Sequence, residues 1–366
     1  MIPACKGRNE MRSEPSRRPR RWRPAAELHR GRFGTKIQFK ELSTAFSLAL
    51  VIFISLCLMP QAALADGPVT PSATNYLAKV THVPAGLQAQ TVDGYVQLWV
   101  RATPGERVVI EDFRGAPYLK FTRAGVFINH NSEEYYLNQL PLPAIPPPGL
   151  TATTPPQWLK ISSGHQHTWR EGRLHALATV ALVPGQSYVG SWRIPVAVNG
   201  VQGYIGGGMW HHAPPSPLWF WPVLVMVLCA LAAWRVRDSE LDRRLAKGLT
   251  LLMMGLFVLA IASRQLHGRP TVDLSQVLGL AVVTAVVAIL AGRELRRPAP
   301  GIVILLGSAA AALWAGITLI PVLTHGYVLV AFPPLFDRCL VVALLGGSLA
   351  LFLVGIRYLG KLPEQP

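Results

Sequence analysis

The C-terminal part of the chain is a series of long apolar stretches, and this pattern restricts the fold more than any other feature. A helix needs about 20 apolar residues to cross a hydrocarbon core of about 30 Å. Only 15% of the residues are charged, against about 25% in soluble proteins. We therefore predict a mixed multidomain membrane protein that ends in an all-α bundle, residues 218–358. About five transmembrane helices are expected, at 218–234, 248–266, 274–292, 301–323 and 339–356.

The N-terminus carries half of the chain's formal net charge of +16. Residues 1–43 are basic and broken by prolines, and we expect them to form a disordered leader. Residues 44–65 form an apolar run that ends in Ala63-Leu64-Ala65. A basic segment, an apolar segment and a small-x-small site are typical of a secretory signal peptide. The alternatives are an uncleaved signal anchor and a start codon downstream of Met1.

The charges between the apolar stretches predict the orientation of the chain. Lys and Arg are concentrated after the first, third and fifth stretches, and such residues favour the cytoplasmic side. Residues 66–217 are therefore expected outside a bacterial cytoplasmic membrane, and the tail, 359–366, inside. The centres of the five stretches contain no Asp, Glu, Lys or Arg, and the one charged residue within their bounds is Arg264, near the end of the second. This argues against a proton-coupled transporter, because such proteins carry ionisable groups at membrane depth.

Residues 66–217 are predicted to form one extracytoplasmic all-β domain, an Ig-like β-sandwich. Short runs rich in Val, Ile, Tyr and Trp alternate with turn pairs such as Asp93-Gly94 and Asn199-Gly200, as in sandwiches. Residues 141–156 are proline-rich and predict an extended loop. The expected strands are 96–100, 108–110, 118–121, 126–128, 176–183, 192–198 and 203–205.

Histidines are the candidate metal ligands of this domain. His165 and His167 would lie on one side of a strand, and we expect His175 to reach them from a paired strand. Imidazoles without thiolate suit copper, with zinc less favoured. Glu171 and Arg173 would orient the ligands from behind. His211 and His212 form a second candidate pair, for which a plain polar role at the membrane interface is the stronger interpretation.

Catalytic patterns are weak in the exported domain. Glu111-Asp112 and Glu133-Glu134 are neighbours in sequence, so their side chains should point in opposite directions. We expect both pairs to be solvated surface, and we predict no enzyme. Residues 203–208 are rich in glycine but lack the strand-to-helix context of a phosphate-binding loop. No nucleic-acid partner is expected, because the domain has ten basic and eight acidic residues.

Several segments resemble a group of bacterial multi-pass membrane proteins. The residues are Gly115-Ala116-Pro117-Tyr118, Ser132-Glu133-Glu134-Tyr135-Tyr136-Leu137-Asn138 and Trp169-Arg170-Glu171-Gly172-Arg173-Leu174-His175. Members of that group have a signal peptide, an outer β-domain and C-terminal spans. The resemblance implies no activity, although the group's histidine-rich segment implies a role in metal binding. Here Arg170 and Gly172 stand at histidine positions, Ala176 replaces a tryptophan, and only His175 is retained.

These observations predict a membrane-anchored binding or accessory protein. The more specific version of this prediction is copper handling at the cell surface, through His165, His167 and His175. The alternative is a structural protein whose β-domain docks another envelope protein, with residues 141–156 as the contact loop. A small-solute permease is the third hypothesis. The partners expected are therefore the lipid bilayer, a metal ion and an envelope protein.

Overall fold

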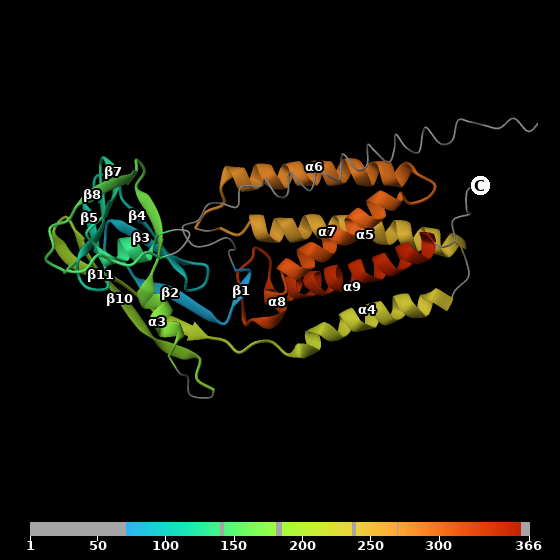
Figure 1. Ribbon diagram of the computed structural model, residues 1–366, viewed down its shortest axis with the longest axis horizontal. Helices are drawn as coiled ribbons and strands as arrows, with labels where there is room; N and C mark the ends of the chain where they lie inside the picture. Colours follow the sequence, from blue (N-terminus) through green and yellow to red (C-terminus); the bar gives the residue numbers. More distant parts are fainter. Residues whose placement is uncertain (1–70, 140–142, 181–184, 236–238, 269, 360–366) are drawn as a thin grey trace, which may run out of the picture. The chain divides into compact units, whose positions relative to one another are not determined.

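The computed structural model describes residues 71–139, 143–180, 185–235, 239–268 and 270–359. The predicted leader, the predicted signal peptide and residues 360–366 of the predicted tail lie outside these ranges. The described chain begins with strands and ends with helices (Figure 1). This arrangement confirms the predicted fold class, a β-domain followed by a helical bundle.

The larger part of the β-domain is a seven-stranded antiparallel sheet in the order β2-β11-β10-β5-β6-β7-β8. Residues on successive positions of a strand point to opposite sides. Ile194 and Val196 of β10 are fully buried on one side, whereas the alternating residues Arg193 and Pro195 are exposed on the other. The strands are β2 Tyr76–His82, β5 Val108–Glu111, β6 Pro117–Thr122, β7 Gly125–Asn129, β8 Trp158–Ser162, β10 Tyr188–Val198 and β11 Val201–His211.

A second, three-stranded sheet completes the core. It contains β3 Leu87–Val92, β4 Gln97–Ala102 and β9 Gln166–Arg170. Leu98 and Trp169 from this sheet join Phe121 and Ile205 from the larger one in a single buried cluster. Two antiparallel sheets that share one core form a sandwich-like domain.

Two short helices in the β-domain were not expected. The prediction of a strand at 176–183 is wrong at its start, because residues 176–178 form the end of helix α3, Gly172–Ala178. Residues 181–184 lie outside the described ranges. Leu174 is buried and Leu177 packs against the core, which is the i, i+3 spacing of a helix face. The other helix is α2, Glu133–Leu137. The described residues after it, 143–157, contain no helix or strand, as predicted for the proline-rich loop.

The glycine-rich stretch lies inside β11 and forms no phosphate loop. A side chain at Gly207 would meet the backbone oxygen of Lys79 at 1.9 Å and the ring of Trp192 at 2.6 Å. Only glycine therefore lets β2 and the Trp192 ring approach β11 at this point.

Within the described ranges, four helices are long and apolar enough to cross a membrane, namely 217–235, 240–265, 274–296 and 334–358. The fourth predicted span, 301–323, is divided at Pro321, which starts a separate short helix. Its first part has 17 residues and spans about 25 Å at 1.5 Å per residue. The elements are η1 Pro217–Phe220, α4 Trp221–Ala232, η2 Ala233–Arg235, α5 Ser239–Gln265, α6 Leu274–Arg296, α7 Ile302–Thr318, α8 Pro321–Thr324 and α9 Pro334–Leu359.

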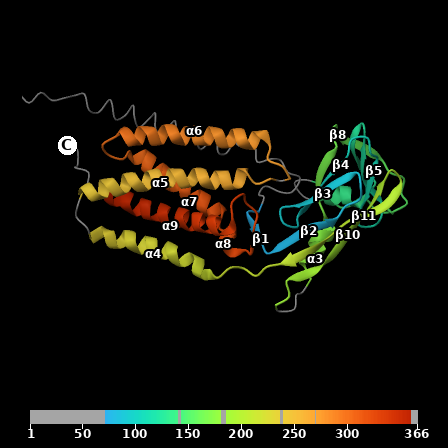
Figure 2. The same ribbon diagram turned by 180° about the vertical axis from the view of Figure 1, so that it is seen from behind.

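Helix α9 packs against α4, α5 and α7 through glycines (Figures 1 and 2). The side chain of Met226 on α4 fills the space beside Gly346, and Met253 on α5 fills the space beside Gly347. Small residues allow helices to approach closely in this way. The loop before α9 contributes β12, Tyr327–Val328, which pairs with β1, Ala73–Thr74.

Buried charges among the described helices lie near the helix ends. Arg357 bonds Asp242 between α9 and α5, and Ser263 donates to Asp337 at 2.7 Å near the opposite ends of the same helices. Glu294, close to the end of α6, accepts from the Gly301 amide at 2.7 Å. The apolar centres that the sequence predicts are therefore held together by polar bonds at their borders.

We predict that Gly207→Ala destabilises the β-domain by at least about 2 kcal/mol, because the added methyl group overpacks the β2–β11 contact. Gly172→Ala is the matched control, since nothing lies within 4 Å of a side chain there. Urea unfolding of the detergent-solubilised full chain, followed by tryptophan fluorescence, measures the difference. Equal stability of both variants would contradict this account of β11.

Candidate functional site

Three segments that are distant in sequence meet inside the β-domain and bury three carboxylates. Asp112, Glu134 and Glu171 are each at most 2% exposed. They come from the turn after β5, from α2 and from the residue before α3. We call these carboxylates, together with Ser132, Trp169 and Arg173, the carboxylate network. Two of the segments that resemble the membrane-protein group, 132–138 and 169–175, supply five of its six residues.

Glu171 and Arg173 form the central ion pair of the network. Nε of Arg173 donates to Oε1 of Glu171 at 2.6 Å, and Nη2 donates to Oε2 at 3.0 Å. The indole N–H of Trp169 donates to the same Oε2 at 3.0 Å. The Glu171 side chain also caps α3 by accepting from the Arg173 amide at 3.1 Å. A buried carboxylate is tolerated because charged and neutral donors surround it.

Asp112 closes the turn between β5 and β6. Its Oδ1 accepts from the amides of Arg114 and Ala116 at 2.9 and 2.8 Å, and its Oδ2 accepts from the Ser132 hydroxyl at 2.7 Å. Arg173 reaches the same turn, because its Nη2 donates to the backbone oxygen of Glu111 at 3.0 Å. The network thus connects β5, α2, β9 and α3.

Glu134 is the carboxylate that lacks a full set of donors. Asn138 donates to its Oε1 at 3.4 Å, whereas Oε2 has no hydrogen-bond partner among the described residues. Burial, and then the negative charges of Glu171 and Asp112, raise the pKa of Glu134 to about 8. The side chain therefore holds a proton at neutral pH. The network therefore contains one carboxyl group that can release a proton, Glu134, beside one ion pair, Glu171–Arg173.

The sequence prediction for the acidic pairs was half right. Glu111 and Glu133 are partly exposed, but Asp112 and Glu134 are buried. Solvated surface is therefore wrong for Asp112 and Glu134. Glu134 lies within Ser132–Asn138, one of the segments that resemble the membrane-protein group, and this is the signal that could have identified it. Asp112 lies outside those segments, and its sequence neighbourhood gives no such signal. Glu171 and Arg173 were expected behind metal ligands, and here they bond each other.

The structure distributes the predicted histidine ligands over different surroundings. His167 lies on β9 and its ring stacks against Trp169, with centroids 6.5 Å apart. Burial lowers the pKa of His167 to about 4, so the ring is neutral. His175 lies on α3 and not on a paired strand, and its Nε2 accepts from Nε of Arg170 at 3.1 Å. His165 precedes β9 and is partly exposed.

Among the described residues, no three His, Cys, Asp or Glu side chains are grouped as a metal site. In the second candidate pair, the ring of His211 contacts Tyr76 and the ring of His212 contacts Tyr327. Copper binding by His165, His167 and His175 stays a prediction from the sequence. The geometry adds an obstacle, because a guanidinium occupies Nε2 of His175.

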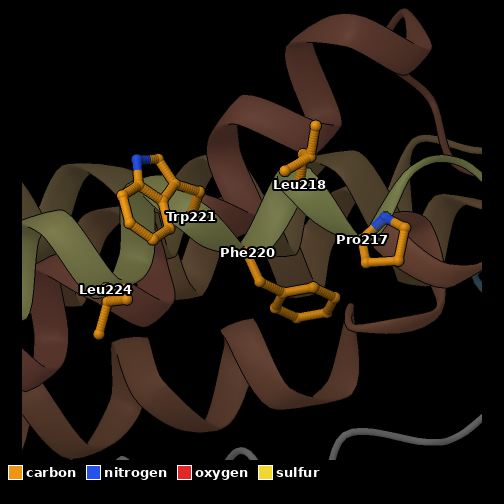
Figure 3. Close-up of a pocket in the computed structure, with 5 residues that line it drawn as sticks. All are labelled: Pro217, Leu218, Phe220, Trp221 and Leu224. Carbon is orange, nitrogen blue, oxygen red and sulfur yellow. The ribbon is translucent and has the colours of Figure 1, made fainter.

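A hollow of about 490 Å³ lies on the surface at η1 and α4. Its lining is entirely apolar: Pro217, Leu218, Phe220, Trp221 and Leu224. Figure 3 shows Phe220 and Trp221 pointing away from opposite sides of the helix. Apolar side chains directed outward from a candidate span suit contact with lipid. The hollow offers no group for chemistry.

Comparisons with known proteins give no relatives: no family model, no curated protein and no solved structure matches the chain.

The carboxylate network makes stability depend on pH. The pKa of Glu134 rises from the ordinary 4.5 to about 8 in the folded chain. Its contribution to stability is therefore complete below about pH 4.5 and is lost as the pH rises through about 8. We expect the unfolding midpoint of the wild type to fall over this range relative to that of Glu134→Gln, measured in urea at each pH. Glu133→Gln, on the exposed neighbour, should follow the wild type. A constant difference between wild type and Glu134→Gln would contradict the buried proton.

Removal of the Arg173 guanidinium should strongly destabilise the β-domain. Arg173→Ala leaves Glu171 buried without its ionic partner, so we expect a loss of about 3–5 kcal/mol in the free energy of unfolding. Arg114→Ala is the control, because the Arg114–Glu133 pair has an arginine that is 56% exposed. Exposed pairs contribute less than about 1 kcal/mol. Equal losses in the two variants, measured by urea unfolding, would rule out a central role for Arg173.

Proposed function

We propose that this chain is a membrane-anchored binding protein whose β-domain engages a ligand or partner outside the bilayer. The observation that carries the proposal is the difference between the two parts of the chain. The β-domain has its own core and a polar network, whereas the described helices have apolar centres with charges only near their ends. Apolar centres suit an anchor better than a path for ions or protons.

The proposed orientation places the β-domain outside and the C-terminus in the cytoplasm. Its support is the charge at the helix ends. The end of α6 carries Arg293 and Arg296, and the last turn of α9 carries Arg357, whereas the β-domain joins the opposite end of the bundle at Pro217. Basic residues favour the cytoplasmic side.

Binding of an envelope component is favoured over copper handling. Nε2 of His175 is bonded to Arg170, and the described residues hold no three-ligand group. The surface best suited to binding is the side of the seven-stranded sheet that faces away from the core, which we call the outer face. Ser191 and Arg193 on β10 are exposed there.

Site-specific photo-crosslinking in native membranes tests the proposal. A benzoylphenylalanine at Ser191, on the outer face, should give defined adducts of the full chain. The same residue at Gln88, exposed on β3 of the smaller sheet, is the control and should give none. Adducts at neither position, or the same adducts at both, would refute binding through the outer face.

A further inference from the structure

The β-domain separates its charges between interior and surface. Seven carboxylates lie in its described part, and four of them are buried: Asp93, Asp112, Glu134 and Glu171. None of its ten Lys and Arg residues is buried. The domain contains almost as many acidic as basic residues, yet its surface is therefore strongly basic.

The outer face collects these basic residues. The seven strands of the larger sheet contain four Lys and Arg: Lys79 on β2, Arg193 on β10, Lys120 on β6 and Lys160 on β8. The strand pairing places all four side chains on the side of the sheet that faces away from the core. Lys120, for example, pairs with Val109 and Phe127, and Lys160 also pairs with Phe127. The only carboxylate in these strands is Glu111, which ends β5 beyond a register shift.

Aromatic rings hold three of the four cations against the sheet. Nζ of Lys79 lies 5.6 Å from the ring centre of Trp210, Cζ of Arg193 lies 4.9 Å from Tyr204, and Nζ of Lys120 lies 4.2 Å from Trp158. Cation–π contacts of this kind restrict the side chains. Groups that are ordered before binding lose less entropy when a ligand arrives.

The rings themselves lie along the sheet, because glycines leave room beneath them. A side chain at Gly206 would meet the Tyr204 ring at 2.8 Å, and one at Gly208 would meet the rings of Trp210 and Tyr188 at 2.8 and 3.0 Å. The result is a face on which aromatic rings lie along the sheet among separated positive charges. Across seven strands it extends about 29 Å along the sheet, at about 4.8 Å per strand.

We propose that the outer face binds an acidic polysaccharide, in an extended conformation across the strands. This inference rests on the proposed function and names its ligand class. Carboxylate groups at intervals along a sugar chain match separated Lys and Arg side chains. The exposed ring of Tyr188, 42% exposed, offers an apolar surface to the face of a sugar ring.

Two other polyanions fit the face less well. An anionic membrane surface is bound by apolar side chains that protrude into the lipid, whereas Tyr204 and Trp210 lie flat. Single-stranded nucleic acid requires free ring faces for base stacking, and the faces of Tyr204 and Trp210 are covered by Arg193 and Lys79. Burial, and then the positive charge of Arg107, lower the pKa of Lys120. The effect of Arg107 shows that cations lie close together in this region, but it does not favour one polyanion over another.

The test uses the full chain in phosphatidylcholine nanodiscs with sodium polygalacturonate as the probe. We expect saturable binding that weakens as salt is raised, and no binding of the neutral polymer dextran. Lys79→Gln/Arg193→Gln should weaken binding about tenfold, whereas the charge-conserving Lys79→Arg/Arg193→Lys should stay within about threefold of the wild type. The matched control, Arg101→Gln/Arg123→Gln, removes two exposed cations outside the outer face and should bind like the wild type.

Three outcomes would overturn the inference. They are absence of polygalacturonate binding, equal loss in the two glutamine double variants, and equally tight binding of a single-stranded oligonucleotide or of phosphatidylglycerol vesicles. Unfolding midpoints of the double variants should match that of the wild type, since the substituted residues are exposed. If polygalacturonate fails to bind while the Ser191 crosslinks persist, the ligand class is wrong and the proposed binding function stands.

Discussion

The ion pair between Glu171 and Arg173 is the interaction on which the β-domain depends. Burying a carboxylate is unfavourable by several kcal/mol unless donors replace its water. Here one guanidinium, one indole and one backbone amide surround Glu171, and the same guanidinium bonds the β5–β6 turn. Because Glu171 also caps α3, the pair fixes a helix, a turn and the end of β9 together. Burial raises the pKa of Glu134 most, and the charge of Arg173 partly offsets this rise.

Much of the fold follows from patterns that the sequence displays. Short runs rich in Val, Ile, Tyr and Trp between turn pairs predict β4 to β7, β10 and part of β11, and apolar length predicts the spans. The prediction fails where tertiary contacts outweigh local preference. The segment from Ala176 reads as a strand because it is rich in Ala and Val, but the Glu171 cap and the burial of Leu174 make its first residues helical. Pro321 divides the fourth predicted span because proline cannot continue a helix.

The candidate site is less predictable, because burial of an acidic residue leaves no mark in its own sequence neighbourhood. Asp112 and Glu134 each stand beside an acidic residue that is more exposed, Glu111 and Glu133. Neighbouring side chains leave the backbone in different directions on strands and on helices alike, so one member of each pair can be interior and the other nearer the surface. The donors that make the interior positions tolerable, Arg173 and Ser132, are separated from them in the chain. Spacing alone therefore predicts surface for all four.

The same separation explains why composition misrepresents the surface. Ten basic and eight acidic residues between 66 and 217 suggest a nearly neutral domain, and that balance argues against a polyanion ligand. The argument assumes that both signs are equally exposed. Once Asp93, Asp112, Glu134 and Glu171 are interior, the basic residues of the outer face have few carboxylates to neutralise them. The network that stabilises the inside of the domain is thus also the reason why its outside is positively charged.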